Sequence, residues 1–283
     1  TLSPERRQDL LVLSVLVVLA TYWWRTVPKN AEHQISYWSY APDRYRLASQ
    51  LLVALHNHPF TLYAYAALFF VVSLYATYLL LRPKDYWLLV FILSAAWMVY
   101  GGYYLYCAFM YPIFAYAVKY DKPNALVFLA LVKEHALALG ILWLLLKRRY
   151  GHAVVVAFVG GAIYLTIVWI QGPATYSPPR NDSLLAIPFM VERVLTSPEW
   201  VFWKSFMAPF ILIAAYQEST REEHLLFLAN TALVLALGFW WEFQLWMPLV
   251  VISLSMRMHC SELPGPETRI SPSANPQTTP NRQ

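Results

Sequence analysis

Charged residues and glycines are scarce in this sequence. Charged residues make up 13% of the 283 positions, against about 25% in an ordinary soluble domain, and only 9 glycines occur. Hydrophobic residues make up 59% and aromatic residues 17%, so the chain has too little polar surface to remain in water. No stripe of lysine and arginine with interleaved aromatics lies outside the membrane-flanking positions, which argues against nucleic-acid binding. The composition therefore predicts an integral membrane protein whose partners include membrane lipids and no nucleic acid.

Cysteine is also scarce, with only Cys107 in an apolar segment and Cys260 near the C-terminal tail. Two such positions form neither a disulfide framework nor the spacing of a metal site. The sequence also contains no internal repeat, no glycine-rich phosphate loop, no nucleophile elbow and no heptad array. We therefore expect no metal and no organic cofactor.

Long apolar runs dominate what is present. About 20 apolar residues in a helix cover a hydrocarbon core of about 30 Å, and seven runs approach that length, so we predict an all-α bundle with about seven membrane spans. Two of the runs are ambiguous, because apolar residues continue over 86–118 and over 225–256. The seven runs lie at 9–26, 60–81, 86–107, 124–146, 153–170, 200–216 and 225–245. The first follows two arginines as a signal peptide would, but it has no small-x-small cleavage site, so we interpret it as a retained span.

The chain divides into a helical membrane domain, 1–260, and a tail rich in proline, serine and threonine, 261–283. The tail has no apolar periodicity, so we expect it to be disordered. Two long loops, 27–59 and 171–199, connect predicted spans, and each contains a short helical pattern with an apolar face, over Tyr45 to Leu55 in the first loop and Asp182 to Leu195 in the second. These patterns predict two amphipathic helices that lie in the membrane interface.

Lysine and arginine in short loops mark the cytoplasmic side of a membrane protein. With the N-terminus inside, most of these cations occupy inside positions, and only Lys119 and Lys122 lie in a short outside loop. The predicted topology has a cytoplasmic N-terminus and places both long loops, 27–59 and 171–199, on the outer face. The odd number of spans places the tail there as well. The inside cations are Arg6, Arg7, Arg82, Lys84, Lys147, Arg148, Arg149 and Arg221.

Three ionisable residues interrupt the apolar run 124–146. Lys133, Glu134 and His135 lie near its middle, where a central charge costs about 2.5–3.5 kcal/mol. At about 100° per residue they cannot share one face of a helix, so we expect at least one to point into the bundle and to have a polar partner. As a functional site they would form a proton or substrate relay or an anchor for a phosphate. As a structural feature they would form an ion pair or mark a span boundary.

An acidic residue stands beside two arginines in the first long loop. The Asp43 carboxylate could act as a general base or hold a metal at the membrane surface, and Arg44 and Arg46 could hold a lipid phosphate. The structural alternative is that Asp43 caps a short helix. His56 and His58 would diverge at a helix end, and because no third ligand accompanies them we predict no metal site.

Two later acidic patterns complete the candidates. Glu242 lies among large aromatics in the segment Trp-Trp-Glu-Phe-Gln-Leu-Trp-Met-Pro, and it is either the solvated end of the last span or a buried substrate-binding carboxylate. The run Arg221-Glu222-Glu223-His224 is superficially similar to the glutamate pairs of membrane proteases and di-metal sites. No downstream histidine at helical spacing completes such a site, so we expect this run to be a solvated loop.

Several of these features together resemble one family. They are an N-in first span, a long outer loop with Asp43 before an interfacial helix, a second span and the late segment around Glu242. The arrangement is similar to that of multi-pass C-type glycosyltransferases, which use lipid-phosphate-linked sugars and keep an acidic catalytic residue in the first outer loop. The late segment resembles the Glu-x-Arg-x-x-x-Pro pattern of related bacterial membrane proteins, with Gln244 in place of the arginine and with fewer spans in the chain. The resemblance implies Asp43 as the base, and Arg44, Arg46 and Glu242 as substrate-binding residues.

Three functions follow from these patterns. Our main prediction is an accessory or structural subunit of a membrane complex, because polar residues are few within the spans and no paired acidic motif occurs. The first alternative is a C-type glycosyltransferase-like enzyme that uses a lipid-phosphate-linked sugar on the outer face. The second is a small transporter with Lys133, Glu134 and His135 as its coupling site, although matched repeat halves are not visible. The sequence leaves open whether the chain is an enzyme.

Overall fold

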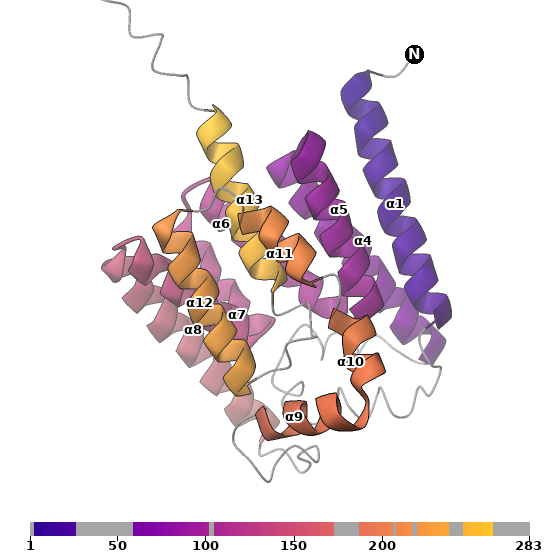
Figure 1. The fold of residues 1–283 in the computed structure, drawn as a ribbon. Coiled ribbons are helices and arrows are strands. Elements are labelled where there is room, and N and C mark those ends of the chain that lie inside the picture. Colours follow the sequence, from indigo (N-terminus) through magenta and orange to yellow (C-terminus); the bar gives the residue numbers. More distant parts are fainter. Residues whose placement is uncertain are drawn as a thin grey trace, which may run out of the picture.

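The computed structural model describes residues 3–26, 59–101, 105–172, 187–205, 208–216, 220–237 and 246–262. The regular elements within these ranges are all helices, as predicted (Figure 1). Three of the helices are long and apolar enough to cross a membrane, which supports the prediction of a membrane protein. They are Pro4–Thr26, Ala64–Leu81 and Tyr150–Gln171.

Shorter helices, several of them apolar, account for the rest of the described bundle. In chain order the elements are α1 (Pro4–Thr26), α4 (Pro59–Leu81), α5 (Asp85–Gly101), the 3-10 helix η2 (Leu105–Phe109), α6 (Met110–Lys119), the 3-10 helix η3 (Pro123–Leu131), α7 (Glu134–Leu146), α8 (Tyr150–Gln171), α9 (Ile187–Thr196), α10 (Pro198–Ser205), α11 (Ala208–Tyr216), α12 (Arg221–Leu237) and α13 (Met247–Glu262).

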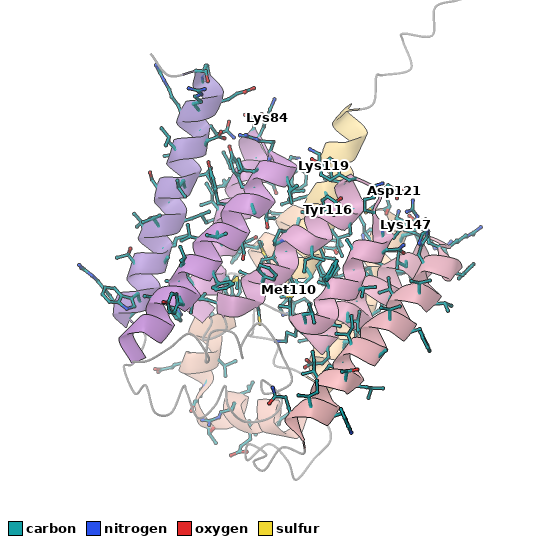
Figure 2. The ribbon with its side chains drawn as sticks, turned by 180° about the vertical axis from the view of Figure 1, so that it is seen from behind. Lys84, Met110, Tyr116, Lys119, Asp121 and Lys147 are labelled. Carbon is teal, nitrogen blue, oxygen red and sulfur yellow. The ribbon has the colours of Figure 1, made fainter. Side chains whose placement is uncertain are left out.

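Helices α1 and α4 pack side by side and antiparallel at one edge of the bundle (Figure 1). The carboxylate of Asp9, near the start of α1, accepts a hydrogen bond of 2.9 Å from the Tyr78 hydroxyl and forms an ion pair with Arg82, which follows α4. The start of α1 and the end of α4 therefore lie at the same end of the bundle. Lys84, Lys119 and Lys147 lie at this end too (Figure 2), and we call it the cationic end.

The stretch 86–118, ambiguous in the sequence, forms two antiparallel elements. Helix α5 leaves the cationic end, and η2 followed by α6 returns to it (Figure 2). The Tyr111 hydroxyl of α6 donates a hydrogen bond of 3.4 Å to the sulfur of Met98 in α5, while α6 packs mainly on α4, η3 and α13. The stretch 86–118 is therefore not one continuous helix.

The predicted span 124–146 is instead a helical hairpin. It begins with η3 at the cationic end, reverses direction at Val132 and Lys133, and returns through α7 to the same end. A Cβ placed on Gly140 would lie 3.2 Å from Leu129 Cδ1 and 3.5 Å from Leu126 Cδ1, which is the contact expected between two antiparallel arms. The prediction of one continuous helix over this run was wrong.

The two arms of the hairpin have similar lengths although they contain different numbers of residues. The nine residues of η3 rise about 2.0 Å each and span about 18 Å. The 13 residues of α7 rise about 1.5 Å each and span about 20 Å. The extended 3-10 geometry thus lets a short arm reach the depth of a longer α-helical arm.

Helix α8 packs along this hairpin. Its buried residues, Ala153, Val156 and Gly160, form a single stripe, and a Cβ on Gly160 would lie only 2.9 Å from Leu137 Cδ1 of α7. At the cationic end, His152 Nδ1 lies 2.9 Å from Asn124 Oδ1 of η3. Helices α7 and α8 are therefore antiparallel neighbours, and η3 contacts both.

The C-terminal part also contains more elements than predicted. Helix α9 lies across the end of the bundle opposite the cationic end, at the place expected for an interfacial helix (Figure 1). The run 200–216 is shared between α10 and α11, and the run 225–256 between α12 and α13. The interfacial helix predicted over Tyr45–Leu55 lies outside the described residues, as does the tail after Glu262.

The grouping of cations differs from the predicted topology. Arg149 forms an ion pair with Asp121, and Lys147 Nζ lies 3.1 Å from Glu222 Oε2 at the start of α12. The turn that contains Lys119 and Lys122 therefore lies at the same end as Lys147, not opposite it. The physical reason is the hairpin, because a segment that turns back adds no crossing between these two turns.

The core is apolar and aromatic, as the composition requires. The largest fully buried side chains are Trp23, Trp97, Tyr78, Tyr111, Phe70, Phe91, Phe114 and Leu16. Several hydroxyls inside apolar helices donate to the carbonyl four residues earlier, among them Thr77 to Ser73 at 2.7 Å, Ser94 to Val90 at 2.7 Å and Ser255 to Val251 at 2.6 Å. Each of these hydroxyls is satisfied within its own helix, as an apolar environment demands.

Candidate functional site

Four of the predicted site residues cannot be compared with the structure. Asp43, Arg44, Arg46 and Glu242 lie outside the described residues. Their assigned roles as base and substrate-binding residues stay predictions. The three ionisable residues of the predicted intramembrane cluster are described.

Lys133 lies at the tip of the hairpin, between η3 and α7. Its backbone is extended, with φ −162° and ψ 128°, and this single extended residue separates the two helical arms. The Lys133 N–H donates to the Leu129 carbonyl at 2.9 Å, while the Lys133 carbonyl accepts from the Leu137 N–H at 3.2 Å. The residue is only 6% exposed, although lysine is rarely buried unless it is paired.

Glu134 and His135 follow Lys133 in the first turn of α7. Both are partly exposed, and both ring nitrogens of His135 are buried. Glu134 is well placed electrostatically, because the amino-terminal end of a helix carries a partial positive charge. Each of these three residues makes at least one interaction within the molecule, so the cluster is part of the bundle and does not face lipid alone.

The packing of α7 on α8 gives the depth of the cluster. Leu137 of α7 lies level with Gly160 of α8, ten residues along a helix that starts at Tyr150 near the cationic end. Because α7 has 13 residues, its first residue lies about 20 Å from the cationic end.

A second polar cluster was missed by the sequence analysis. Thr220 and Glu223 form a capping box at the start of α12, in which the Thr220 N–H donates to Glu223 Oε2 at 2.6 Å and the Glu223 N–H donates to Thr220 Oγ1 at 3.4 Å. The run from Arg221 to His224 is therefore helical and not a loop. Glu223 is only 4% exposed, so the predicted solvated face is wrong for this residue.

Burial of Glu223 depends on an arginine from another helix. Nη1 of Arg257, in α13, lies 3.1 Å from Glu223 Oε1, and the two side chains are 15% and 5% exposed. The same nitrogen donates to the Ser253 carbonyl at 3.0 Å, and the guanidinium lies 4.8 Å from the centre of the Trp87 ring in α5. A planar guanidinium can serve a carboxylate and an aromatic face together. The contacts of Arg257 with Glu223 and Trp87 thus connect α13 to α12 and α5 at the cationic end.

Other ion pairs at this end are more exposed. The side chains of Arg82 and Asp9 are 46% and 20% exposed, and those of Lys147 and Glu222 are 27% and 49% exposed. Burial acts to lower the pKa of Arg82, but its hydrogen bonds to Asp9 and Tyr78 outweigh burial and the pKa lies above its ordinary value. These pairs join the ends of neighbouring helices.

Neither a metal site nor a similarity to known proteins assigns a function to these clusters. Across the described residues, histidine, cysteine and acidic side chains form no group of three or more that could hold a metal ion. No protein-family model matches the chain, and no curated protein and no solved structure shows a significant match to it.

Proposed function

We propose that the chain is a multi-pass membrane protein that binds the phosphate of a lipid-linked substrate at Lys133. The observation that carries this proposal is the burial of Lys133, which is only 6% exposed. Lys133 directly precedes α7, a helix of 13 residues, and lies about 20 Å from the cationic end. An ionisable residue at such a depth is a candidate functional site, because it is costly to keep there.

The chemistry of the hairpin tip favours an anion. A lysine ammonium in an apolar interior is stabilised by a nearby negative charge, and the amino-terminal end of α7 adds a partial positive charge at the same place. Glu134 and His135 follow Lys133 in the first turn of the same helix. A phosphate monoester would bring negative charge and strong acceptor oxygens to this place.

The direction from which the substrate enters follows from the charge distribution. Lysine and arginine concentrate on the cytoplasmic side of membrane proteins, so the cationic end is assigned to the cytoplasm and Lys133 to the outer half. This location agrees with the resemblance to C-type glycosyltransferases, in which the lipid-linked sugar is used on the outer face. In that interpretation Asp43 activates the acceptor hydroxyl, Lys133 with Arg44 and Arg46 neutralises the departing phosphate, and Glu242 binds substrate.

The test is binding of a polyprenyl phosphate to the full chain in lipid nanodiscs. The expected result is a rise in the thermal unfolding midpoint with polyprenyl phosphate and none with the neutral polyprenol. Lys133→Gln should abolish the rise, while Lys119→Gln at the cationic end should retain it. Equal responses to the phosphate and the neutral alcohol, or an unchanged response in a folded Lys133→Gln protein, would refute the proposal.

A second candidate, the accessory subunit, is favoured by the surface of α8. Only three of its 22 residues are buried, and its exposed side includes Phe158 at 78%, Leu165 at 65% and Trp169 at 83%. A neighbouring membrane helix could cover this face. A photo-crosslinking amino acid at Phe158 separates the candidates, since a subunit would give one stoichiometric protein adduct in native membranes, and a free-standing protein would give lipid adducts alone.

A further inference from the structure

Charged residues occupy the left-handed turns at the cationic end. Among the described non-glycine residues, positive φ values occur at Arg82 (49°), Asp85 (47°), Asp121 (54°) and Arg148 (57°). Arg82, Asp121 and Arg148 lie in the short connections between α4 and α5, α6 and η3, and α7 and α8, and Asp85 is the first residue of α5. A residue with a Cβ is strained in this conformation, and glycine or asparagine would relieve the strain.

Two of these turns use a hydrogen-bond pattern in which glycine is usual. After α7, the Arg148 N–H donates to the Leu145 carbonyl at 2.9 Å and the Arg149 N–H to the Leu144 carbonyl at 2.8 Å. This is the Schellman motif, with Arg148 at its left-handed position. After α6, the Lys122 N–H donates to the carbonyl five residues earlier at 3.0 Å. Neither turn has the usual glycine at its left-handed position: Arg148 occupies it after α7, and Asp121 occupies it after α6.

Exposed tyrosines accompany the charged turns. Tyr86, Tyr116, Tyr120 and Tyr150 are 44%, 42%, 49% and 61% exposed, and each lies within a few residues of one of the three turns. Tyrosine is enriched at the level of the lipid headgroups, where its ring is apolar and its hydroxyl is hydrated. The exposed tyrosines therefore favour a location of these turns in the headgroup region.

We infer that the three turns form a binding surface for anionic phospholipid headgroups. Lys84, Lys122 and Arg148 are exposed and stand in the turns beside these tyrosines, so their charges can reach the phosphates of the surrounding leaflet. Such an interaction contributes about 1 kcal/mol per cation near an anionic membrane surface, which corresponds to about fivefold in affinity. Lys133 lies about 20 Å from this surface along α7, and the inference does not depend on the site proposed there.

The test compares the full chain in nanodiscs of phosphatidylcholine with nanodiscs that also contain phosphatidylglycerol. Two readouts are used, the thermal unfolding midpoint and the enrichment of phosphatidylglycerol around the protein. We expect phosphatidylglycerol to raise the midpoint of the parent chain. The triple variant Lys84→Gln, Lys122→Gln and Arg148→Gln should lose this rise, with enrichment reduced about fivefold per cation, while Arg193→Gln on α9 should keep it.

Arg148→Gly separates charge from strain. In phosphatidylcholine alone it should unfold at a higher temperature than the parent, because glycine relieves the left-handed conformation, yet it should gain less from phosphatidylglycerol. Free glycerol phosphate added to phosphatidylcholine nanodiscs should have no effect. A parent chain indifferent to phosphatidylglycerol, a triple variant with the full response, or an equal response to glycerol phosphate would each overturn the inference.

Discussion

The contact between α7 and α8 can be tested at two adjacent glycines. A Cβ on Gly160 would lie 2.9 Å from Leu137 Cδ1 and 3.1 Å from Leu137 Cδ2, whereas a Cβ on Gly161 would meet nothing within 4 Å. Gly160→Leu therefore forces a side chain into the space of Leu137, and Gly161→Leu places the same side chain in open space. Both changes remove a helical glycine, so the gain in helix propensity, about 0.5–1 kcal/mol, is common to both.

The difference between the two variants isolates the overpacking. Forcing extra carbons into a packed contact costs about 1–3 kcal/mol, so Gly160→Leu should be less stable than Gly161→Leu by that amount. Thermal unfolding in detergent, followed by size-exclusion chromatography with fluorescence detection, measures the difference. Adding Leu137→Ala to Gly160→Leu should recover part of the loss, because the two positions are in contact. Equal midpoints for the two glycine variants, with no recovery in the double variant, would show that α8 does not pack on α7 in this register.

Two further predictions concern the ion pairs. Glu223→Gln leaves Arg257 buried without its carboxylate and should lower the free energy of unfolding by about 3–5 kcal/mol. Glu222→Gln is the control, because the Glu222 side chain is 49% exposed, and it should change the free energy of unfolding by no more than about 1 kcal/mol. Similar losses of stability in the two variants would contradict the burial of Glu223. Asp9→Asn should lower the free energy of unfolding by about 1 kcal/mol or less, because the Arg82 side chain is 46% exposed. This loss of stability should become smaller as salt is added. A large loss that does not depend on salt would argue against a surface ion pair.

Apolar runs identify the helices in this sequence but not the places where the chain turns back. The run 124–146 is long enough to cross a membrane as one α-helix, so its length alone predicts a span. The structure divides it at Lys133, where one extended residue separates a 3-10 arm from an α-helical arm. The charges at this midpoint are the local signal of the break. The choice between a paired charge in a span and a hairpin tip depends on packing against α8, which the sequence does not reveal.

The cluster at Glu223 shows the same limit in another form. Thr220 and Glu223 have the spacing of a capping box, so the start of a helix there was readable from the sequence. The burial of Glu223 was not, because it depends on Arg257, 34 residues later, and on Trp87 in a distant helix. Asp43 and Glu242, on which the resemblance to glycosyltransferases rests, lie outside the described residues, and their roles stay predictions.

The hairpin is the central claim, since it places Lys133 deep in the bundle and groups the cationic turns at one end. Labelling of single cysteines by a membrane-impermeant maleimide tests it most directly, in a chain with Cys107 and Cys260 replaced by alanine. Lys122→Cys and Arg148→Cys, which flank the hairpin, should react from the same side of sealed, oriented vesicles. Reaction from opposite sides would show that 124–146 crosses the membrane once, and the hairpin with its buried tip would be wrong.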